Sequence, residues 1–229
     1  MKCLIISIII CITSSFAAAQ EYLYEIGAMG GGAFYMGDAN KNAAFRNTNP
    51  AGGVIFRYNA NFRIAFAADI AWAQVSGTTT GLENEFPNDA QATFSRNVFE
   101  IGGHGEFNFF PYSDKFQYLH TKRVSPFIAG GLGVAASPGE GSTMISPYLT
   151  LGTGVKYKIK NRFNLGAELF ARKLFSDRLE GNDTLDGPYD IPSSPLKNKD
   201  WYVMLTISLT YDFGLRDCNC DKTELNKIL

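Results

Sequence analysis

Apolar and polar residues alternate along the last long apolar run of the chain, from Asp200 to Gly214. Every second residue from Trp201 onward is apolar, and the positions between them include Thr206 and Ser208. A period of two predicts a β-strand with one apolar and one polar face, whereas a helix would spread its polar residues around the circumference. The run exceeds the usual strand of about five or six residues and suffices to cross a bilayer, which takes about nine to eleven tilted residues.

The same alternation recurs upstream and predicts eight strands in all. They span residues 22–36, 52–59, 62–72, 99–109, 124–134, 145–157, 163–171 and 201–213. The connections alternate in length, because 59–61 and 160–162 are tight turns whereas 37–49, 77–93 and 176–199 are long and polar, and the shorter 137–143 lies on their side. Short periplasmic turns with longer external loops are the rule for outer-membrane barrels. Only residues 111–122 break the pattern, because they are long for a periplasmic turn.

The direction in which the polar faces point separates a membrane barrel from a soluble barrel such as a lipocalin. These faces combine ionisable residues with many Gly and Ala residues, which suits a narrow lumen better than a solvated surface rich in Lys and Glu. We therefore expect the apolar faces to point outward. The predicted fold is all-β: an eight-stranded antiparallel transmembrane β-barrel with long external loops and a short periplasmic C-terminal tail.

The inward-facing charges predict a closed interior. An eight-stranded barrel is just wide enough for side chains to fill, and unpaired charges there would be costly. We expect opposite charges to pair across the lumen and to plug it, which argues against an open channel. The predicted ion-pair network is charge-balanced when His104 is neutral, and it comprises Glu25, Arg57, Arg63, Asp69, Arg96, Glu100, Glu106, Lys156, Glu168 and Arg172.

The first residues predict export from the cytoplasm. Lys2, an apolar run over 3–12 and alanines at 17–19 are typical of a secretory signal peptide, which we expect to be cleaved. The predicted organisation is a signal peptide over 1–19, a barrel over 20–214 and a periplasmic tail over 215–229. The protein is then a multi-pass barrel of the cell outer membrane with both termini periplasmic. A formal net charge of −1 gives no sign of a nucleic-acid partner.

The sequence predicts no catalytic residue, no cofactor and no metal. Its two histidines, His104 and His120, lack the spacing to each other and to cysteines that zinc sites use. His104 falls in mid-strand on the inward face, where lipid cannot reach it. A hydrogen-bonded lumen histidine is therefore expected, rather than the general base of a lipid-modifying enzyme.

The C-terminal tail carries Cys218 and Cys220 around a single residue. A bridge between them would be strained, although the periplasm is oxidising. Three outcomes stay open: a strained local disulfide, a bridge to a partner's cysteine, or an unstructured end. Together with residues 111–122, the tail gives the periplasmic side more material than a bare barrel needs, which suggests a docking face.

Four segments resemble the PorG-like small outer-membrane barrels of the type IX secretion system of Bacteroidota. They are "GGGAFYMGDAN" at 30–40, "ARKLFSDRLEG" at 171–181, "SLTYDFG" at 208–214 and the "CNC" of the tail. The resemblance runs over essentially the whole mature chain. It implies a non-enzymatic part of a protein-transport machine, which anchors a periplasmic ring built from a lipoprotein and its partner protein to the outer membrane and its lipids.

Under this resemblance, the periplasmic face would contact the ring. The candidate partner-binding residues, chosen by their place in the predicted topology, are Tyr112, Asp114, Lys115, Tyr118, His120, Lys122, Arg123, Arg216, Cys218 and Cys220. Two other readings stay open. One is a small OmpW-like barrel that passes hydrophobic solutes through a lateral opening, and the other is a membrane-embedded enzyme of lipid modification.

Overall fold

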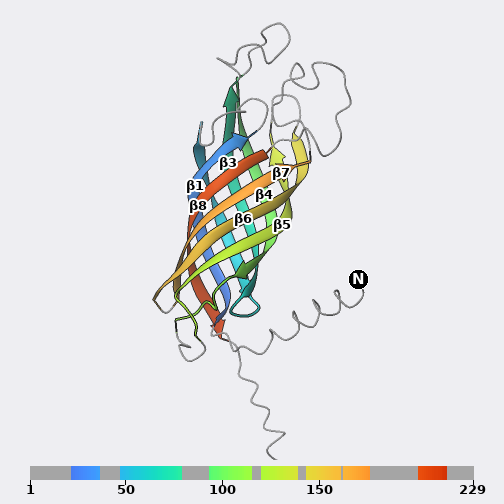
Figure 1. The fold of residues 1–229 in the computed structure, drawn as a ribbon. Coiled ribbons are helices and arrows are strands. Elements are labelled where there is room, and N and C mark those ends of the chain that lie inside the picture. The colour runs from blue at the N-terminus through green and yellow to red at the C-terminus, as the bar shows by residue number, and fades with distance from the viewer. Residues whose placement is uncertain are drawn as a thin grey trace, which may run out of the picture.

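The computed structural model describes residues 22–36, 47–78, 93–114, 120–138, 143–160, 162–175 and 201–215. These residues form a closed antiparallel barrel of eight strands that follow one another in sequence order (Figure 1). The strands are β1 (Tyr22–Met36), β2 (Asn49–Asn59), β3 (Ile64–Thr78), β4 (Thr93–Asn108), β5 (Val124–Ser137), β6 (Met144–Lys160), β7 (Phe163–Leu174) and β8 (Trp201–Leu215). The predicted eight-stranded antiparallel barrel is thereby confirmed.

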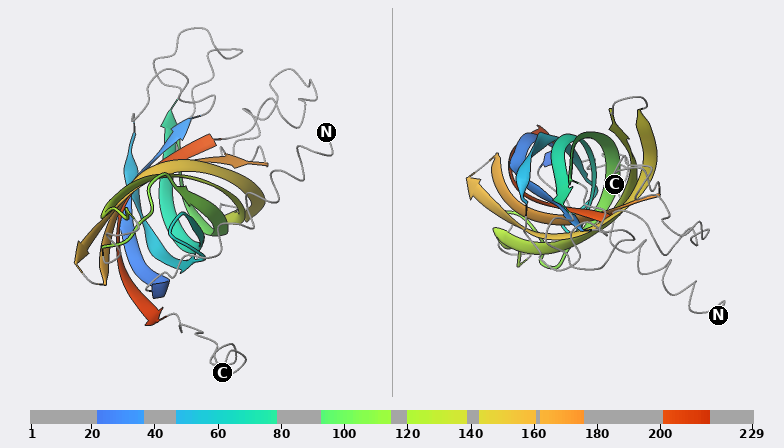
Figure 2. Two further views of the ribbon diagram at one scale, coloured as in Figure 1. Left: turned by 60° about the horizontal axis from the view of Figure 1, so that its bottom comes forward. Right: turned by 90° about the horizontal axis from the view of Figure 1, so that it is seen from above.

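The ring closes without a free strand edge, as the view from above shows (Figure 2). β1 and β8 are paired from Tyr22 with Leu215 to Met36 with Trp201. Among the described strand pairs, the register shifts only between β6 and β7, near Lys158. Such closure pairs the backbone N–H and C=O groups of every strand with its neighbours, which a bilayer-spanning structure requires.

The barrel has two distinct ends. The turn end holds Tyr22, Leu215, the short connections between β2 and β3 and between β6 and β7, and the longer β4–β5 connection. The opposite end is called the loop end here. The predicted signal peptide, the tail beyond Leu215 and most of the predicted long loops lie outside the described residues.

The apolar face of each strand points outward. In β8, Ile207 is 62% exposed and Leu209 is 51% exposed, whereas Ser208 and Thr210 between and after them are 1% and 2% exposed. The same outward pattern continues around the ring, with exposed apolar residues such as Ile26, Phe56, Ile70, Ile101, Ile128, Leu151 and Leu165. This arrangement confirms the predicted orientation and is the reverse of a soluble barrel. None of the described residues forms a helix long and apolar enough to cross a membrane.

Apolar side chains fill the interior near the loop end. Tyr35, Tyr148 and Tyr202 are almost completely buried there, together with Val98 and Leu174. Two methionines and small residues, mostly alanines of β1, β2, β3 and β5, complete this cluster. The charged part of the interior therefore lies between this apolar layer and the turn end.

Candidate functional site

Arg57 of β2 forms the centre of the charged interior. Its Nε donates to Glu106 Oε1 of β4 at 2.9 Å, its second terminal nitrogen pairs with Glu168 of β7, and Nη1 lies 3.6 Å from Glu25 Oε2 of β1. Lys156 of β6 also pairs with Glu106. All five side chains are almost inaccessible to water. One guanidinium thus ties together carboxylates from three other strands across the barrel.

Neutral polar side chains add further hydrogen bonds to the carboxylates of Glu25 and Glu168. Asn59 donates to Glu25 Oε1 at 2.9 Å, and Thr210 donates to its Oε2 at 3.1 Å. Ser208 donates to Glu168 Oε1 at 2.8 Å. Because these donors belong to β2 and β8, the inward polar positions of both strands serve the network.

A second charged layer lies nearer the loop end, around Arg172 of β7. Its guanidinium contacts Glu100 Oε1 at 2.6 Å and Asp69 Oδ2 at 3.4 Å. The Tyr202 hydroxyl donates to the other oxygen of Glu100. His104 joins the two layers, because its Nδ1 lies 3.4 Å from Asp69 Oδ1 and its Nε2 lies 3.3 Å from an oxygen of Glu106. Both ring nitrogens can donate to these carboxylates only in the imidazolium form.

A third group closes the turn end. Lys158 Nζ lies 2.8 Å from Asp212 Oδ2, and Asn164 donates to Asp212 Oδ1 at 2.6 Å. The Tyr112 hydroxyl, which comes from the β4–β5 connection, donates to Asn164 Oδ1 at 2.9 Å. Burial raises the pKa of Tyr112 above its ordinary value, and the nearby Glu25 carboxylate adds to this rise. Tyr112 therefore enters the barrel as a neutral side chain.

Backbone hydrogen bonds hold the β4–β5 connection against this end. The Tyr112 N–H donates to the Phe62 carbonyl at 3.1 Å, and Ser113 N–H donates to the Lys122 carbonyl at 3.2 Å. The Lys122 N–H in turn donates to the Pro111 carbonyl at 2.8 Å. These bonds, together with the Tyr112 hydroxyl, make the described part of the connection a cap on the interior.

The structure brings together most of the residues predicted for the lumen network. Glu25, Arg57, Asp69, Glu100, Glu106, Lys156, Glu168 and Arg172 are all buried and paired. Arg63 is a correction, because it is exposed in the β2–β3 turn before β3 begins at Ile64, so the alternation of β3 does not extend to it. Arg96 is only half-buried and lies on the loop-end side of Glu100.

The sequence missed the Lys158 and Asp212 pair. Both residues stand at inward positions of their strands, so the alternation itself was the signal that could have found them. With this pair included, the buried charged side chains among the described residues are six carboxylates and four cations, besides His104. The predicted charge balance is therefore wrong. The interior carries more carboxylates than cations, and a protonated His104 reduces the difference.

The predicted partner-binding residues divide into three groups. Tyr112 is a correction, because it is 4% exposed and its hydroxyl is used inside the barrel. His120, Lys122 and Arg123 are exposed at the turn end, and Asp114 is half-buried. The remaining candidates lie outside the described residues: Lys115, Tyr118, Arg216, Cys218 and Cys220.

The interior is filled rather than open. A water-filled pore would expose the side chains that line it, yet Tyr35 and Tyr202 near the loop end and Arg57 at mid-depth are almost fully buried. The described residues contain no group of His, Cys, Asp and Glu that could hold a metal ion. The charged interior thus consists of mutually paired side chains, which connect strands on different sides of the barrel.

Comparison with solved structures finds a small surface protein with the same fold and further outer-membrane proteins with lower similarity. Neisserial surface protein A matches with a TM-score of 0.51 and 14% identity over 83% of this chain and 97% of that chain. OprG from Pseudomonas aeruginosa matches with a TM-score of 0.44 and 10% identity over 85% of this chain and 99% of that chain. Ail of Yersinia pestis gives a TM-score of 0.42 and 12% identity over 84% and 98%. At 14% identity, the likeness to the neisserial protein is one of fold.

Sequence comparison identifies the family. No curated protein matches the chain at a significant level. Residues 2–222, which include every described strand, match the family described as "Domain of unknown function (DUF6089)". The chain therefore belongs to the DUF6089 family, and its fold is a closed barrel with paired charges inside.

Proposed function

We propose that this protein is a non-enzymatic outer-membrane barrel that anchors a periplasmic assembly of the type IX secretion machine. The observation that carries the proposal is the interior: a plugged, ion-paired lumen capped by the β4–β5 connection suits a structural part better than a conduit. The link to the secretion machine comes from the resemblance of four sequence segments to PorG-like proteins.

The exterior supports the membrane location. Its exposed apolar side chains form a ring around a charged interior, which is favourable in lipid and unfavourable in water. The turn end carries the short connections and both ends of the described barrel, so we place it in the periplasm by the usual rule for such barrels.

The cap supports a docking role for the turn end. His120 and Arg123 are exposed there, and backbone hydrogen bonds from Tyr112 to Phe62 and from Lys158 to Arg123 hold the described part of their connection against the barrel rim. A surface that is ordered before binding loses less conformational entropy when a partner docks. The proposed partners are the lipoprotein of the periplasmic ring and its partner protein.

Site-specific photo-crosslinking in cells tests this role. A photoreactive amino acid replaces Lys122 or Arg123 at the turn end, and the exposed Thr143 at the loop end serves as the matched control. We expect the turn-end positions to form covalent adducts with a periplasmic protein and the control to form none. Adducts that are absent from both turn-end positions, or equally frequent from Thr143, would contradict the proposal.

The other two readings receive less support from the geometry. A lateral opening for solutes needs a gap between neighbouring strands, yet all eight neighbouring pairs are hydrogen-bonded around the ring. A lipid-modifying enzyme needs its base where lipid can reach it, yet the ring of His104 is buried between Asp69 and Glu106. Solute uptake into liposomes that contain the purified protein would favour the first of these readings.

A further inference from the structure

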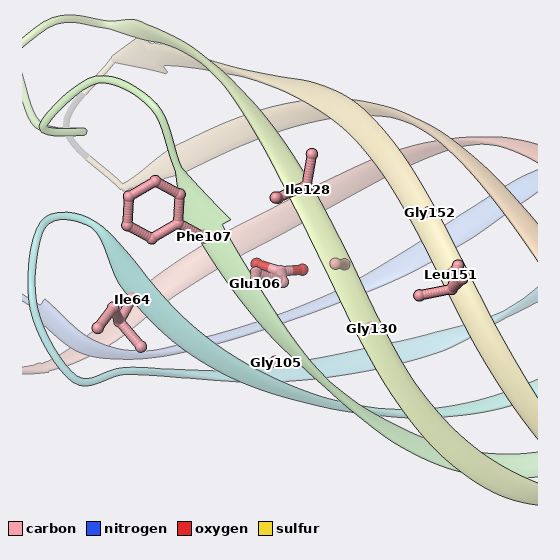
Figure 3. A pocket seen from close by; sticks show the side chains of 9 residues that line it. Ile64, Gly105, Glu106, Phe107, Ile128, Gly130, Leu151 and Gly152 are labelled. Carbon is pink, nitrogen blue, oxygen red and sulfur yellow. The ribbon is translucent and has the colours of Figure 1, made fainter. Parts of the chain in front are cut away.

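An apolar groove of about 530 Å³ runs over the outside of β3 to β6 (Figure 3). Its floor is the pair Gly105 and Gly130, which face each other across the β4–β5 ladder. The next outward pair toward the turn end, Phe107 and Ile128, forms one wall, and Leu151 stands beside Gly130 on β6. The groove therefore exists because two paired outward positions carry no side chain.

The chain itself does not need glycine at the floor. A Cβ on Gly105 would meet nothing closer than Phe66 at 3.9 Å, and a Cβ on Gly130 would meet the tip of Leu151 at 3.3 Å. The inward neighbour Gly131 is different, because a Cβ there would lie 2.1 Å from the Gly103 carbonyl oxygen. Internal packing thus requires the inward glycine, whereas the outward pair leaves room for something outside the protein.

A cation lies at the turn-end mouth of the groove. Ile64 lines the groove, and Arg63 immediately precedes it. The Arg63 guanidinium donates to the Phe109 carbonyl at 3.0 Å, which holds it beside the strand end that carries Phe107. Among the described residues, this is the single hydrogen bond of the guanidinium, so its remaining N–H groups are available to a ligand.

Two further cations lie on the same rim. Lys122 Nζ stands 3.9 Å from the centre of the Phe110 ring, and Arg123 is exposed immediately before β5, the strand that supplies Gly130. The side chain of Arg123 makes no hydrogen bond or ion pair with the described residues. The rim thus offers positive charge where the apolar groove ends.

We propose that the groove binds an anionic phospholipid, with one acyl chain over Gly105 and Gly130 and the phosphate on Arg63, Lys122 and Arg123. Guanidinium groups bind phosphate oxygens through charge-assisted hydrogen bonds, and basic residues at a membrane surface attract anionic lipids. The glycine floor lets a chain lie closer to the barrel than it could on the surrounding Phe, Ile and Leu side chains. The inference rests on the proposed membrane location and is independent of the secretion role.

Native mass spectrometry of the full-length protein in detergent tests the proposal, with phosphatidylglycerol and phosphatidylcholine of identical acyl chains as probes. We expect one phosphatidylglycerol to be retained about tenfold more tightly than phosphatidylcholine. Arg63→Gln should reduce this preference, because it removes one of the three charges and leaves the groove unchanged. Gly105→Leu should weaken the binding of both lipids, because it fills the groove.

Gly30→Leu is the matched control. Gly30 is an exposed glycine of β1, and a Cβ added to it would meet nothing within 4 Å, so this variant adds the same bulk away from the groove. Lipid retention that is equal in all variants, or that falls equally with Gly30→Leu, overturns the proposal. If the protein still floats with liposomes in that case, the membrane location stands and only the lipid site is lost. A protein that stays monodisperse without detergent overturns both.

Discussion

At the scale of single residues, the barrel depends on a few side chains with several partners. Alternation along the sequence was enough to place Arg57, Glu106 and Glu168 on inward faces. It could not show that one guanidinium pairs with both carboxylates, because those contacts depend on strand closure and on which strands lie opposite each other. Arg63 was misplaced for a related reason, since alternation does not reveal where a strand begins.

Replacing Arg57 by methionine should strongly destabilise the barrel. The substitution leaves Glu25, Glu106 and Glu168 buried without their shared cation, and breaking a buried ion pair costs about 3–5 kcal/mol. Urea unfolding in phosphatidylcholine vesicles, followed by tryptophan fluorescence, measures the effect. Arg63→Met is the control, because this exposed residue should change the free energy of unfolding by only about 0.5 kcal/mol. Equal effects of the two substitutions would contradict the central role of Arg57.

Replacing two adjacent glycines of β5 by alanine should change the stability of the barrel to different extents. In Gly131→Ala the new methyl group collides with the backbone of β4, and overpacking of this kind costs about 1–3 kcal/mol. In Gly130→Ala the methyl group points outward and needs only a small shift of the Leu151 side chain. The shift in urea midpoint of each variant checks this expectation. A larger loss from Gly130→Ala would show that the inward and outward faces are assigned wrongly.

At the scale of elements, the β4–β5 connection is the part that sequence reasoning understood least. Its length marked it as unusual for a short-turn end, and the sequence suggested a docking face. The structure adds that its first residues turn inward and that Tyr112 completes the polar interior through Asn164. No local pattern predicts this contact, because it joins a loop residue to the start of β7. The connection is thus both cap and exposed surface.

Removing the Tyr112 hydroxyl should loosen the cap modestly. Tyr112→Phe keeps the ring and loses the hydrogen bond to Asn164, which leaves a buried amide oxygen without this donor. The expected cost is about 1 kcal/mol in the free energy of unfolding. Hydrogen exchange at the Ser113 and Lys122 amides should also become faster, because their bonds belong to the same cap. Unchanged exchange would indicate that the cap does not depend on Tyr112.

The pH dependence of stability should carry a contribution from Tyr112. Burial raises the pKa of this phenol in the folded protein above the ordinary value of 10.0. The raised folded pKa means that its contribution is complete below about pH 10 and is lost as the pH rises above that value. Between about pH 8 and 11, the wild-type protein should therefore lose more stability than Tyr112→Phe. A stability difference between the two proteins that stays constant over this range would contradict this sign.

At the scale of the whole molecule, the closed barrel followed from sequence because its exterior and interior obey one simple alternation. Strand number, antiparallel order and the outward apolar face were all predictable in this way. The outer groove was not, since it depends on pairing between strands, and the excess of buried carboxylates was missed because Arg63 lies in a turn and Arg96 is only half-buried. Gly105 and Gly130 lie far apart in sequence, and only the register of β4 and β5 makes them a single floor.

The intact protein should show no stable conductance in a planar bilayer. Its described interior is filled by apolar residues near the loop end, paired charges at mid-depth and the Tyr112 cap at the turn end. A recording at about 0.15 M salt checks this expectation, since the paired charges lie where salt screens them little. Long-lived openings of uniform size would contradict the plugged lumen.

The distribution of the charged network over the strands also constrains how the chain enters its membrane. Arg57 belongs to β2, whereas its carboxylates come from β1, β4 and β7. A lone hairpin of β3 and β4 would bring Asp69, Glu100 and Glu106 into lipid with His104 but without Arg57 or the cations of β6 and β7, and incompletely compensated ions there are expensive. Stepwise insertion of hairpins is therefore unfavourable. The charge arrangement favours an assembly order in which most strands pair with one another first. The charged side chains of the interior would then lose their water last.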